Sequence, residues 1–239
     1  MDQLWLSFVQ WLHGLGLHID AGTAQVLADG AARATQRLDM PALLALAAAL
    51  GWASGIRLYA VVFLVGGMGA LGWLALPESL AVLQHPAVLM ASGFMLLVEF
   101  FADKVPLLDS LWDGVHAFIR VPAGALLAAG VFGADNASMA LVAGILGGTL
   151  SATALATKMT ARAAANTSPE PFSNWGLSFM EDGMTVGAVW LATQHPVAFG
   201  FALVVALVLS VLLLVLLFKF LRAVLRRVSS LFSASAKVA

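Results

Sequence analysis

The sequence predicts an all-α membrane protein: a polytopic bundle of about six transmembrane helices, preceded by an N-terminal amphipathic helix at the membrane interface. Of its 239 residues, 61% are hydrophobic and only 10% are charged, whereas a soluble domain carries about 25% charged residues. The apolar runs reach the roughly 20 residues that one helical span needs. Lysine and arginine gather on alternate connections between these runs, as the positive-inside rule requires of a multi-pass protein.

Composition also limits the partners. The formal net charge of −1 gives no electrostatic support for a nucleic-acid partner. The chain has no cysteine, which excludes disulfides and thiolate metal sites. The start of the chain lacks the basic region and cleavage site of a signal peptide. The lipid bilayer is therefore the expected partner. The sequence also allows a homo-oligomer.

Residues 1–40 form a separate N-terminal segment. Its apolar residues recur at helical spacing opposite polar ones, at Leu4, Phe8, Trp11, Leu12 and Leu15. This pattern predicts an amphipathic helix that lies in the interface or packs on the cytoplasmic end of the bundle.

Residues 41–218 form the predicted transmembrane domain. The first span, 41–74, is longer than one crossing needs, and glycines at 51–57 and 66–69 predict a break or a strong tilt. A polar turn at 77–86 leads to the second span, 86–104. The stretch 122–133 is short, so the third span either includes the end of a preceding amphipathic helix or is re-entrant.

The second half of this domain is more regular. The fourth span, 137–160, carries Gly144, Gly147 and Ser151 in a small-residue pattern that favours close helix contact. The fifth and sixth spans are 172–193 and 197–218, and a basic cytoplasmic tail follows at 219–239.

The basic residues set the predicted orientation. Six spans with the N-terminus inside place one set of cations on the cytoplasmic side: Arg33, Arg37, Lys104, Arg120, Lys158, Arg162 and the cations of 219–227. Both termini are then cytoplasmic, and the protein is a multi-pass protein of the inner (plasma) membrane.

A short internal repeat also occurs. Pro106, Ser110 and Trp112 recur at the same spacing as Pro169, Ser173 and Trp175. Both copies precede a predicted span at the cytoplasmic side, which predicts a parallel rather than an inverted repeat.

Ionisable residues concentrate around 99–120. Asp109, Asp113, His116 and Arg120 follow at spacings of four, three and four, which places them on one helix face. Three interpretations remain open. The first is a salt-bridged cytoplasmic rim, in which Arg120 pairs with His116 or Asp113, Lys104 pairs with an acid, and the polar face meets water.

The second interpretation is a polar cavity for a solute or a proton. Intramembrane charges are costly, so Arg57, Glu99, Glu181 and Asp182 should face the bundle interior and pair with one another. The third is a divalent-cation site for Mg or Mn, which oxygen ligands suit. Its candidate ligands are Glu99, Asp103, Asp109, Asp113 and His116; otherwise no cofactor is expected.

Arg57 lies near the middle of the first span. The sequence predicts that a carboxylate of Glu181 or Asp182 pairs with it, because an unpaired guanidinium there costs several kcal/mol. The alternative is that Arg57 and the open amides of a broken helix bind an anionic group of a substrate.

Two motifs together carry a family resemblance. They are Glu99 to Pro106 followed by Asp109 to Asp113, His116 and Arg120, and later Ser168 to Trp175 before Glu181 and Asp182. Over about residues 46–217 the chain resembles the bacterial membrane family called domain of unknown function (DUF) 4126. The resemblance implies a multi-pass membrane protein and supplies no reaction and no catalytic residues. Arg57 stands where the family pattern has asparagine, so a role of Arg57 would be particular to this chain.

The predicted function is that of a transporter or permease for a small polar or anionic solute or a lipid headgroup. A non-transporting structural or regulatory membrane protein and a metal-dependent intramembrane enzyme are the alternatives. No catalytic residue is assigned. The candidates for a substrate or proton path are Arg57, Glu99, Asp103, Asp109, Asp113, His116, Arg120, Glu181 and Asp182.

Overall fold

The computed structural model describes residues 38–105, 108–166 and 171–235. These residues form only helices and the turns between them. The α-helices are α3 (Met40–Ala70), α4 (Pro86–Ala102), α5 (Leu108–Gly130), α6 (Ala137–Ala165), α7 (Pro171–Gln194) and α8 (Pro196–Ser235). Two 3-10 helices, η1 (Glu78–Gln84) and η2 (Ala134–Asn136), lie in the connections. The predicted N-terminal amphipathic helix falls on residues 1–37, outside the described part.

Several helices begin at residues that favour a helix N-terminus, namely capping side chains and prolines in the first turn. Asp39 Oδ1 accepts a hydrogen bond from Ala42 N at 3.0 Å and caps α3, and Pro41 occupies the first turn, where its missing N–H is harmless. His85 Nδ1 caps α4 in the same way, accepting from Ala87 N at 3.2 Å. Asn136 Oδ1 caps α6. Each of the six predicted spans overlaps one α-helix in the described part of the chain.

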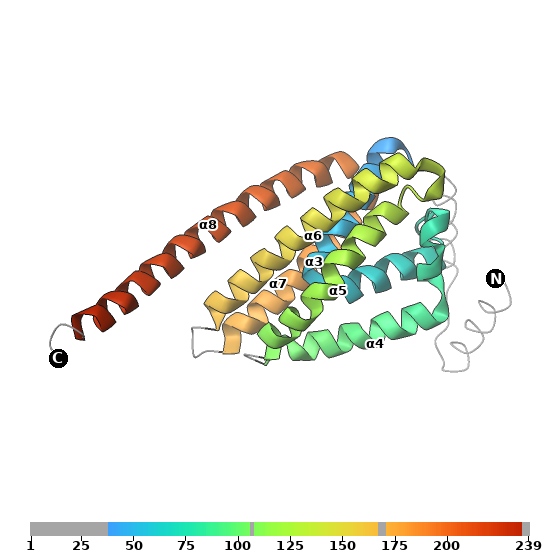
Figure 1. Cartoon of the computed structure of the whole chain (residues 1–239). Coiled ribbons are helices and arrows are strands. Elements are labelled where there is room, and N and C mark those ends of the chain that lie inside the picture. Colours follow the sequence, from blue (N-terminus) through green and yellow to red (C-terminus); the bar gives the residue numbers. More distant parts are fainter. Residues whose placement is uncertain (1–37, 106–107, 167–170, 236–239) are drawn as a thin grey trace, which may run out of the picture.

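Four boundaries differ from the prediction. The stretch 77–86 is not a plain polar turn, because η1 buries Leu80 and Leu83. The amphipathic stretch and residues 122–130 form the single helix α5, with Pro122 inside it, so the third predicted span does include the preceding helix. α6 runs on to Ala165. α8 does not end at Phe218 but continues to Ser235, beyond the rest of the bundle (Figure 1).

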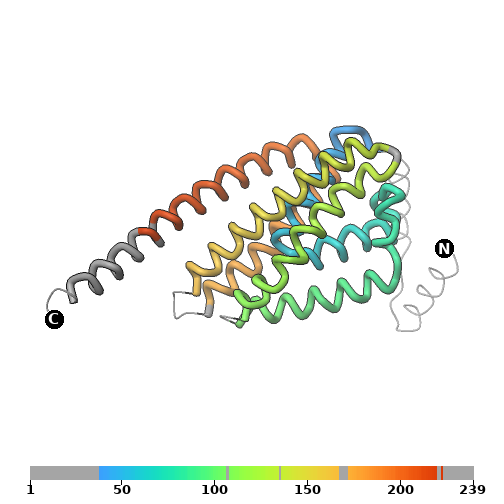
Figure 2. The backbone as a smooth tube through the Cα atoms, in the orientation of Figure 1, coloured from blue at the N-terminus to red at the C-terminus, as the bar shows by residue number. Residues whose placement is uncertain are grey.

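α3 is broken at Arg57, as the glycine pattern predicted. Arg57 has φ −144° and ψ 79°, an extended conformation inside a helix. The two halves, which we call α3a (residues 40–56) and α3b (residues 58–70), turn away from each other at this residue (Figure 2). α3a runs parallel to α6, with Gly51 against Gly147 and Gly55 against Ser151.

α3b returns toward the end of the bundle at which α3a began. Its Gly66 packs on Leu83 of η1, and η1 in turn packs through Leu80 on Gly130, the last residue of α5. Both ends of α3 therefore lie near the connection between α5 and α6 (Figure 1). Arg57, at the break between the two halves, is fully buried. A straight first span would place these ends at opposite ends of the bundle, so the six-span count is not confirmed.

Three small residues let α3, α5 and α6 approach closely. The Cβ that a substitution would add at Gly51, Gly124 or Gly147 meets backbone or side-chain atoms of a neighbouring helix. Ser151 Oγ of α6 donates a hydrogen bond to Arg120 O of α5 at 3.0 Å. The close contact predicted from the small-residue pattern of α6 is confirmed.

The distribution of polarity is that of a membrane protein. In the described part, α3, α6 and α8 are each long and apolar enough to cross a membrane, and η1 with α4, bent by 65°, makes a fourth if this pair is one span. Large apolar side chains point outward, such as Phe94 of α4, Phe118 of α5 (86% exposed) and Phe201 of α8. Nine charged side chains of α3 to α7 and the turn after α4 are instead buried. An exposed apolar surface around a charged interior suits lipid rather than water.

Candidate functional site

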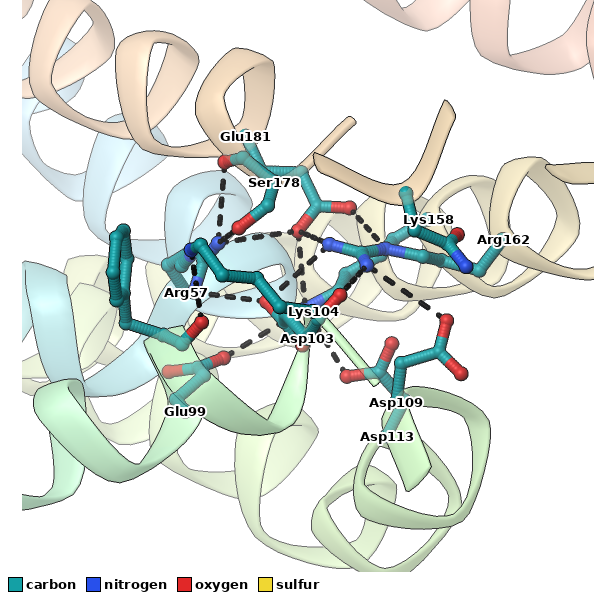
Figure 3. A network of polar contacts seen from close by, with 12 residues as sticks. Arg57, Glu99, Asp103, Lys104, Asp109, Asp113, Lys158, Arg162, Ser178 and Glu181 are labelled. Carbon is teal, nitrogen blue, oxygen red and sulfur yellow. Dashed lines mark hydrogen bonds and ion pairs between the residues drawn. The ribbon is translucent and has the colours of Figure 1, made fainter. Parts of the chain in front are cut away.

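Ten charged residues meet in the interior, close to the break of α3. They come from α3, α4 and the turn after it, α5, α6 and α7 (Figure 3). We call this set the ion-pair cluster: Arg57, Glu99, Asp103, Asp109, Asp113, Arg120, Lys158, Arg162, Glu181 and Asp182. All are buried except Asp182, whose side chain is 29% exposed.

Arg57 is bound by carboxylates of two other segments. Its Nη1 lies 2.9 Å from Asp103 Oδ2, and its Nε lies 2.9 Å from Asp182 Oδ1. Its Nη2 lies 3.7 Å from Glu181 Oε2 and donates to Ser178 Oγ at 2.9 Å. The predicted pairing with Glu181 or Asp182 is confirmed. Asp103, which the sequence did not link to Arg57, is an equally close partner.

Arg162 of α6 joins α7 to the end of α4. Its Nε and Nη2 donate to Glu181 Oε1 and Oε2 at 2.9 and 2.8 Å, a two-pronged contact that fits the planar guanidinium. Its Nη1 donates to Asp103 O at 2.7 Å. Glu181 is therefore bound mainly by Arg162, with Arg57 as its more distant partner.

Arg120 of α5 joins α4. Its Nη1 lies 2.7 Å from Asp113 Oδ1, which precedes it by about two turns on α5, as the rim interpretation predicted. Its Nη2 lies 2.5 Å from Glu99 Oε1 of α4. The rim interpretation is wrong about water, however, because Asp109, Asp113 and Arg120 are each 0% exposed. The polar face of α5 meets α6 and α4 instead.

Lys158 of α6 occupies the centre of the cluster. Its Nζ donates to Ile56 O, the last carbonyl before the break of α3, at 3.1 Å. A helix end leaves carbonyl groups without helical partners, and Lys158 satisfies this one. The same Nζ lies 3.1 Å from Asp113 Oδ1 and 3.3 Å from Glu181 Oε2.

Polar groups at the edge of the cluster bring the starts of α5 and α7 together with the end of α6. Asn166 Nδ2 donates to Asp109 Oδ1 at 3.1 Å and to Ser110 Oγ at 3.1 Å. Asn174 Nδ2 donates to Asn166 Oδ1 at 2.7 Å. The two copies of the internal repeat thus begin helices that share this end of the bundle, although Pro106 and Pro169 fall outside the described residues.

Two predicted residues lie beside the cluster rather than in it. His116 stacks on Trp112 and meets Tyr59 edge-on, and its Nδ1 lies 2.9 Å from Trp112 O. Among the residues that the structure describes, no carboxylate lies within ion-pair distance of Lys104, so the acidic partner predicted for it is not confirmed. Lys104 Nζ instead lies over the Phe100 ring and donates to Phe100 O. Burial lowers the pKa of Lys104, and the positive charge of Arg57 lowers it further.

Three of the cations that the positive-inside argument placed on the cytoplasmic side lie in the interior instead. Arg120, Lys158 and Arg162 are buried in the ion-pair cluster and do not lie in exposed connections. They pair with the buried carboxylates, so they give no evidence on the orientation of the chain in the membrane.

The fully buried charges do not balance. Arg57, Arg120, Lys158 and Arg162 face the carboxylates of Glu99, Asp103, Asp109, Asp113 and Glu181, one carboxylate more than the cations. Several polar atoms also lack a hydrogen bond, among them Glu99 Oε2, Asp113 Oδ2 and both carboxylate oxygens of Asp103. Asp103 is held by charge at short range, without hydrogen-bond geometry. Burying each ion costs several kcal/mol. An apolar interior would hold the helices together without this cost.

The predicted metal ligands do not form a metal centre in the described residues: no group of three or more histidine or acidic side chains is placed to hold a metal ion. Glu99, Asp103, Asp109 and Asp113 face arginine and lysine, and His116 faces aromatic rings. Two hollows in the described part of the molecule are apolar and lie away from the cluster. One, of about 760 Å³, lies between α5 and α6, and the other, of about 390 Å³, lies between α3, α7 and α8.

Sequence reasoning missed Lys158, Arg162 and Ser178 as interior residues. A signal was present for α6: Ser151, Leu155, Lys158 and Arg162 follow at spacings of four, three and four, as the charged face of α5 does. Such spacing places all four on one helix face, and Ser151, Lys158 and Arg162 are buried there.

The chain belongs to the DUF4126 family: the family model described as "Domain of unknown function (DUF4126)" matches residues 44–217. The matched region includes every member of the ion-pair cluster. No curated protein and no solved structure matches the chain.

Proposed function

For this member of the DUF4126 family we infer a transporter or permease-like function, in which the ion-pair cluster controls the passage of a small polar or anionic solute or a lipid headgroup. One observation carries the proposal: α3 breaks at Arg57, inside the membrane domain and among carboxylates from other helices. Discontinuous helices with open ends build the substrate and ion sites of secondary transporters.

The path of α3 supports a specific topology. Its two halves enter and leave at one end of the bundle, as a re-entrant pair does, and α4 to α8 are the helices that cross. The cytoplasmic side is then the end at which α6 and α7 are joined. α8 runs on past this end (Figure 1), and its second half carries the exposed cations Lys219 and Arg222. α3 would begin on the opposite side.

Arg57 is the proposed ligand for an anionic group. Its present partners are carboxylates, which occupy the guanidinium as a substrate carboxylate or phosphate would. Asp182 is the partly exposed partner, at 29% exposure, whereas Asp103 is fully buried. Exchange of Asp182 for an external anion is therefore the smallest rearrangement that opens Arg57. Protonation of Asp182 would favour this exchange and couple it to protons.

Flux through proteoliposomes tests the proposal. The purified protein is reconstituted with an entrapped pH-sensitive dye, and uptake of labelled inorganic phosphate or succinate is followed together with the internal pH. Glu181→Gln should abolish uptake, because Arg162 loses its two-pronged partner. The matched control is Glu78→Gln, the same substitution at an exposed residue of η1, which should keep full uptake. Equal uptake by wild type, both variants and protein-free liposomes would exclude transport of these probes.

A non-transporting structural or regulatory protein is the second candidate. It is favoured by the burial and the mutual pairing of the charged side chains in the ion-pair cluster. In that case Glu181→Gln lowers the unfolding temperature, while ion and solute fluxes of wild type and variant both equal those of empty liposomes. Measuring unfolding and flux on the same preparations separates the two candidates.

A further inference from the structure

The surroundings of Lys158 Nζ resemble the coordination shell of a cation. Oxygen atoms from four helices and the turn after α4 lie around this one nitrogen. They are Ile56 O and Asp113 Oδ1 at 3.1 Å, Glu181 Oε2 at 3.3 Å, and Glu99 Oε1 and Asp103 Oδ2 at 3.7 Å. We call these five atoms the oxygen cage.

We propose that the oxygen cage is a binding site for a monovalent cation, and that in this conformation the ammonium group of Lys158 occupies it as a tethered ion. When the ammonium leaves the cage, a free monovalent cation takes its place. The inference concerns the occupant of the cage and holds whether or not the protein transports a solute.

The composition of the cage supports a cation site. One ligand, Ile56 O, is a backbone carbonyl freed by the break of α3, and unwound carbonyls coordinate cations in transporters with discontinuous helices. Asp103 supplies an independent sign: it is fully buried, and neither of its carboxylate oxygens forms a hydrogen bond. The carboxylate is held by the charges of Arg57, Arg162 and Lys158 alone, whereas a purely structural buried acid is hydrogen-bonded as well.

Charge and size favour a monovalent ion. Replacing one ammonium by one monovalent cation leaves the charge of the cluster unchanged, whereas a divalent ion adds a charge in a site of low dielectric. The distances of 3.1 to 3.7 Å are also longer than the roughly 2.0–2.6 Å that Mg²⁺ and Ca²⁺ require. A K⁺ ion or a small alkylammonium therefore needs the least contraction of the cage.

Thermal unfolding of Lys158→Ala in nanodiscs tests the site. The variant removes the tethered ammonium and leaves room for an ion. At constant ionic strength, replacing choline chloride by KCl or methylammonium chloride should raise its unfolding temperature in a saturable manner. Wild type should show no such difference, and neither should Lys158→Met, because its apolar side chain fills the space. Lys104→Ala is a further control, since it removes a cation beside the cluster without emptying the cage.

Each outcome decides the proposal. Equal unfolding temperatures of Lys158→Ala in choline and in potassium would overturn it, and stabilisation by MgCl₂ or CaCl₂ at lower concentrations than KCl would overturn the monovalent assignment. If Lys158→Ala does not fold, the double variant Lys158→Ala, Asp113→Asn removes one charge of each sign and is measured in the same salts. Failure of this variant to fold even with KCl or methylammonium present would also overturn the proposal, because no free cation then replaces the ammonium.

Discussion

Arg57 Nη1 lies 2.9 Å from Asp103 Oδ2, and both side chains are 0% exposed. This pair links the break of α3 to the end of α4, two places where helical hydrogen bonding is interrupted. Arg162 and Lys158 also approach Asp103 Oδ2, at 3.3 and 3.7 Å. Asp103 is thus the carboxylate on which cations of α3 and α6 converge.

Asp103→Asn should lower stability strongly. Removing one partner of a buried ion pair costs about 3–5 kcal/mol, because the remaining charges lose compensation. Thermal unfolding in nanodiscs, followed by tryptophan fluorescence, measures the loss. Asp182→Asn is the matched control: it also removes a partner of Arg57, but the side chain of Asp182 is 29% exposed, so the unfolding temperature of this variant should fall less. Equal losses would show that Asp103 has no special place in the cluster.

Reversing the charges of Arg57 and Glu181 together should not restore the protein. A glutamate at 57 would face Asp103 and Asp182, and an arginine at 181 would face Arg162 and Lys158. Like charges at such distances are unfavourable in a low dielectric. The yield and unfolding temperature of Arg57→Glu, Glu181→Arg should therefore stay below those of wild type. Full recovery of folding and flux would mean that the two residues form an isolated pair and that Arg57 is no substrate ligand.

Gly147→Val should disrupt the contact of α3, α5 and α6. The added side chain meets Ala128 and Gly51, and overpacking of this kind costs about 1–3 kcal/mol. Gly183→Ala is the control within a helix, because nothing lies within 4 Å of the added Cβ and alanine is the better helix former. We expect a lower unfolding temperature for Gly147→Val and no loss for Gly183→Ala. Similar values for both would argue against close packing at Gly147.

Single cysteines should reveal the path of α3. The natural chain has no cysteine, so each introduced thiol is the only one. Met40→Cys and Glu78→Cys flank α3 and should react with a membrane-impermeant maleimide from the same side. Ala163→Cys, near the end of α6, should react from the other side. Labelling of Met40→Cys together with Ala163→Cys would instead indicate a straight first span.

Much of this architecture was predictable from local patterns. Apolar runs of sufficient length, with Asp39, His85 and Asn136 as caps and Pro41 and Pro86 in first turns, mark helix starts. Helix hydrogen bonds close within a run of residues, so these signals act without tertiary contacts. The glycines before Arg57 also marked the break correctly.

The sequence by itself determined that the chain is helical, that it suits a membrane, and that Arg57, Glu181 and Asp182 belong in its interior, because a lone charge in hydrocarbon is too costly. Only the tertiary structure decided which charges meet. The direction of α3b after the break, the place of Lys158 among carboxylates of other helices, and the burial of the α5 polar face all depend on packing between distant segments. Spacing along one helix states which residues share a face, but it does not say what that face meets.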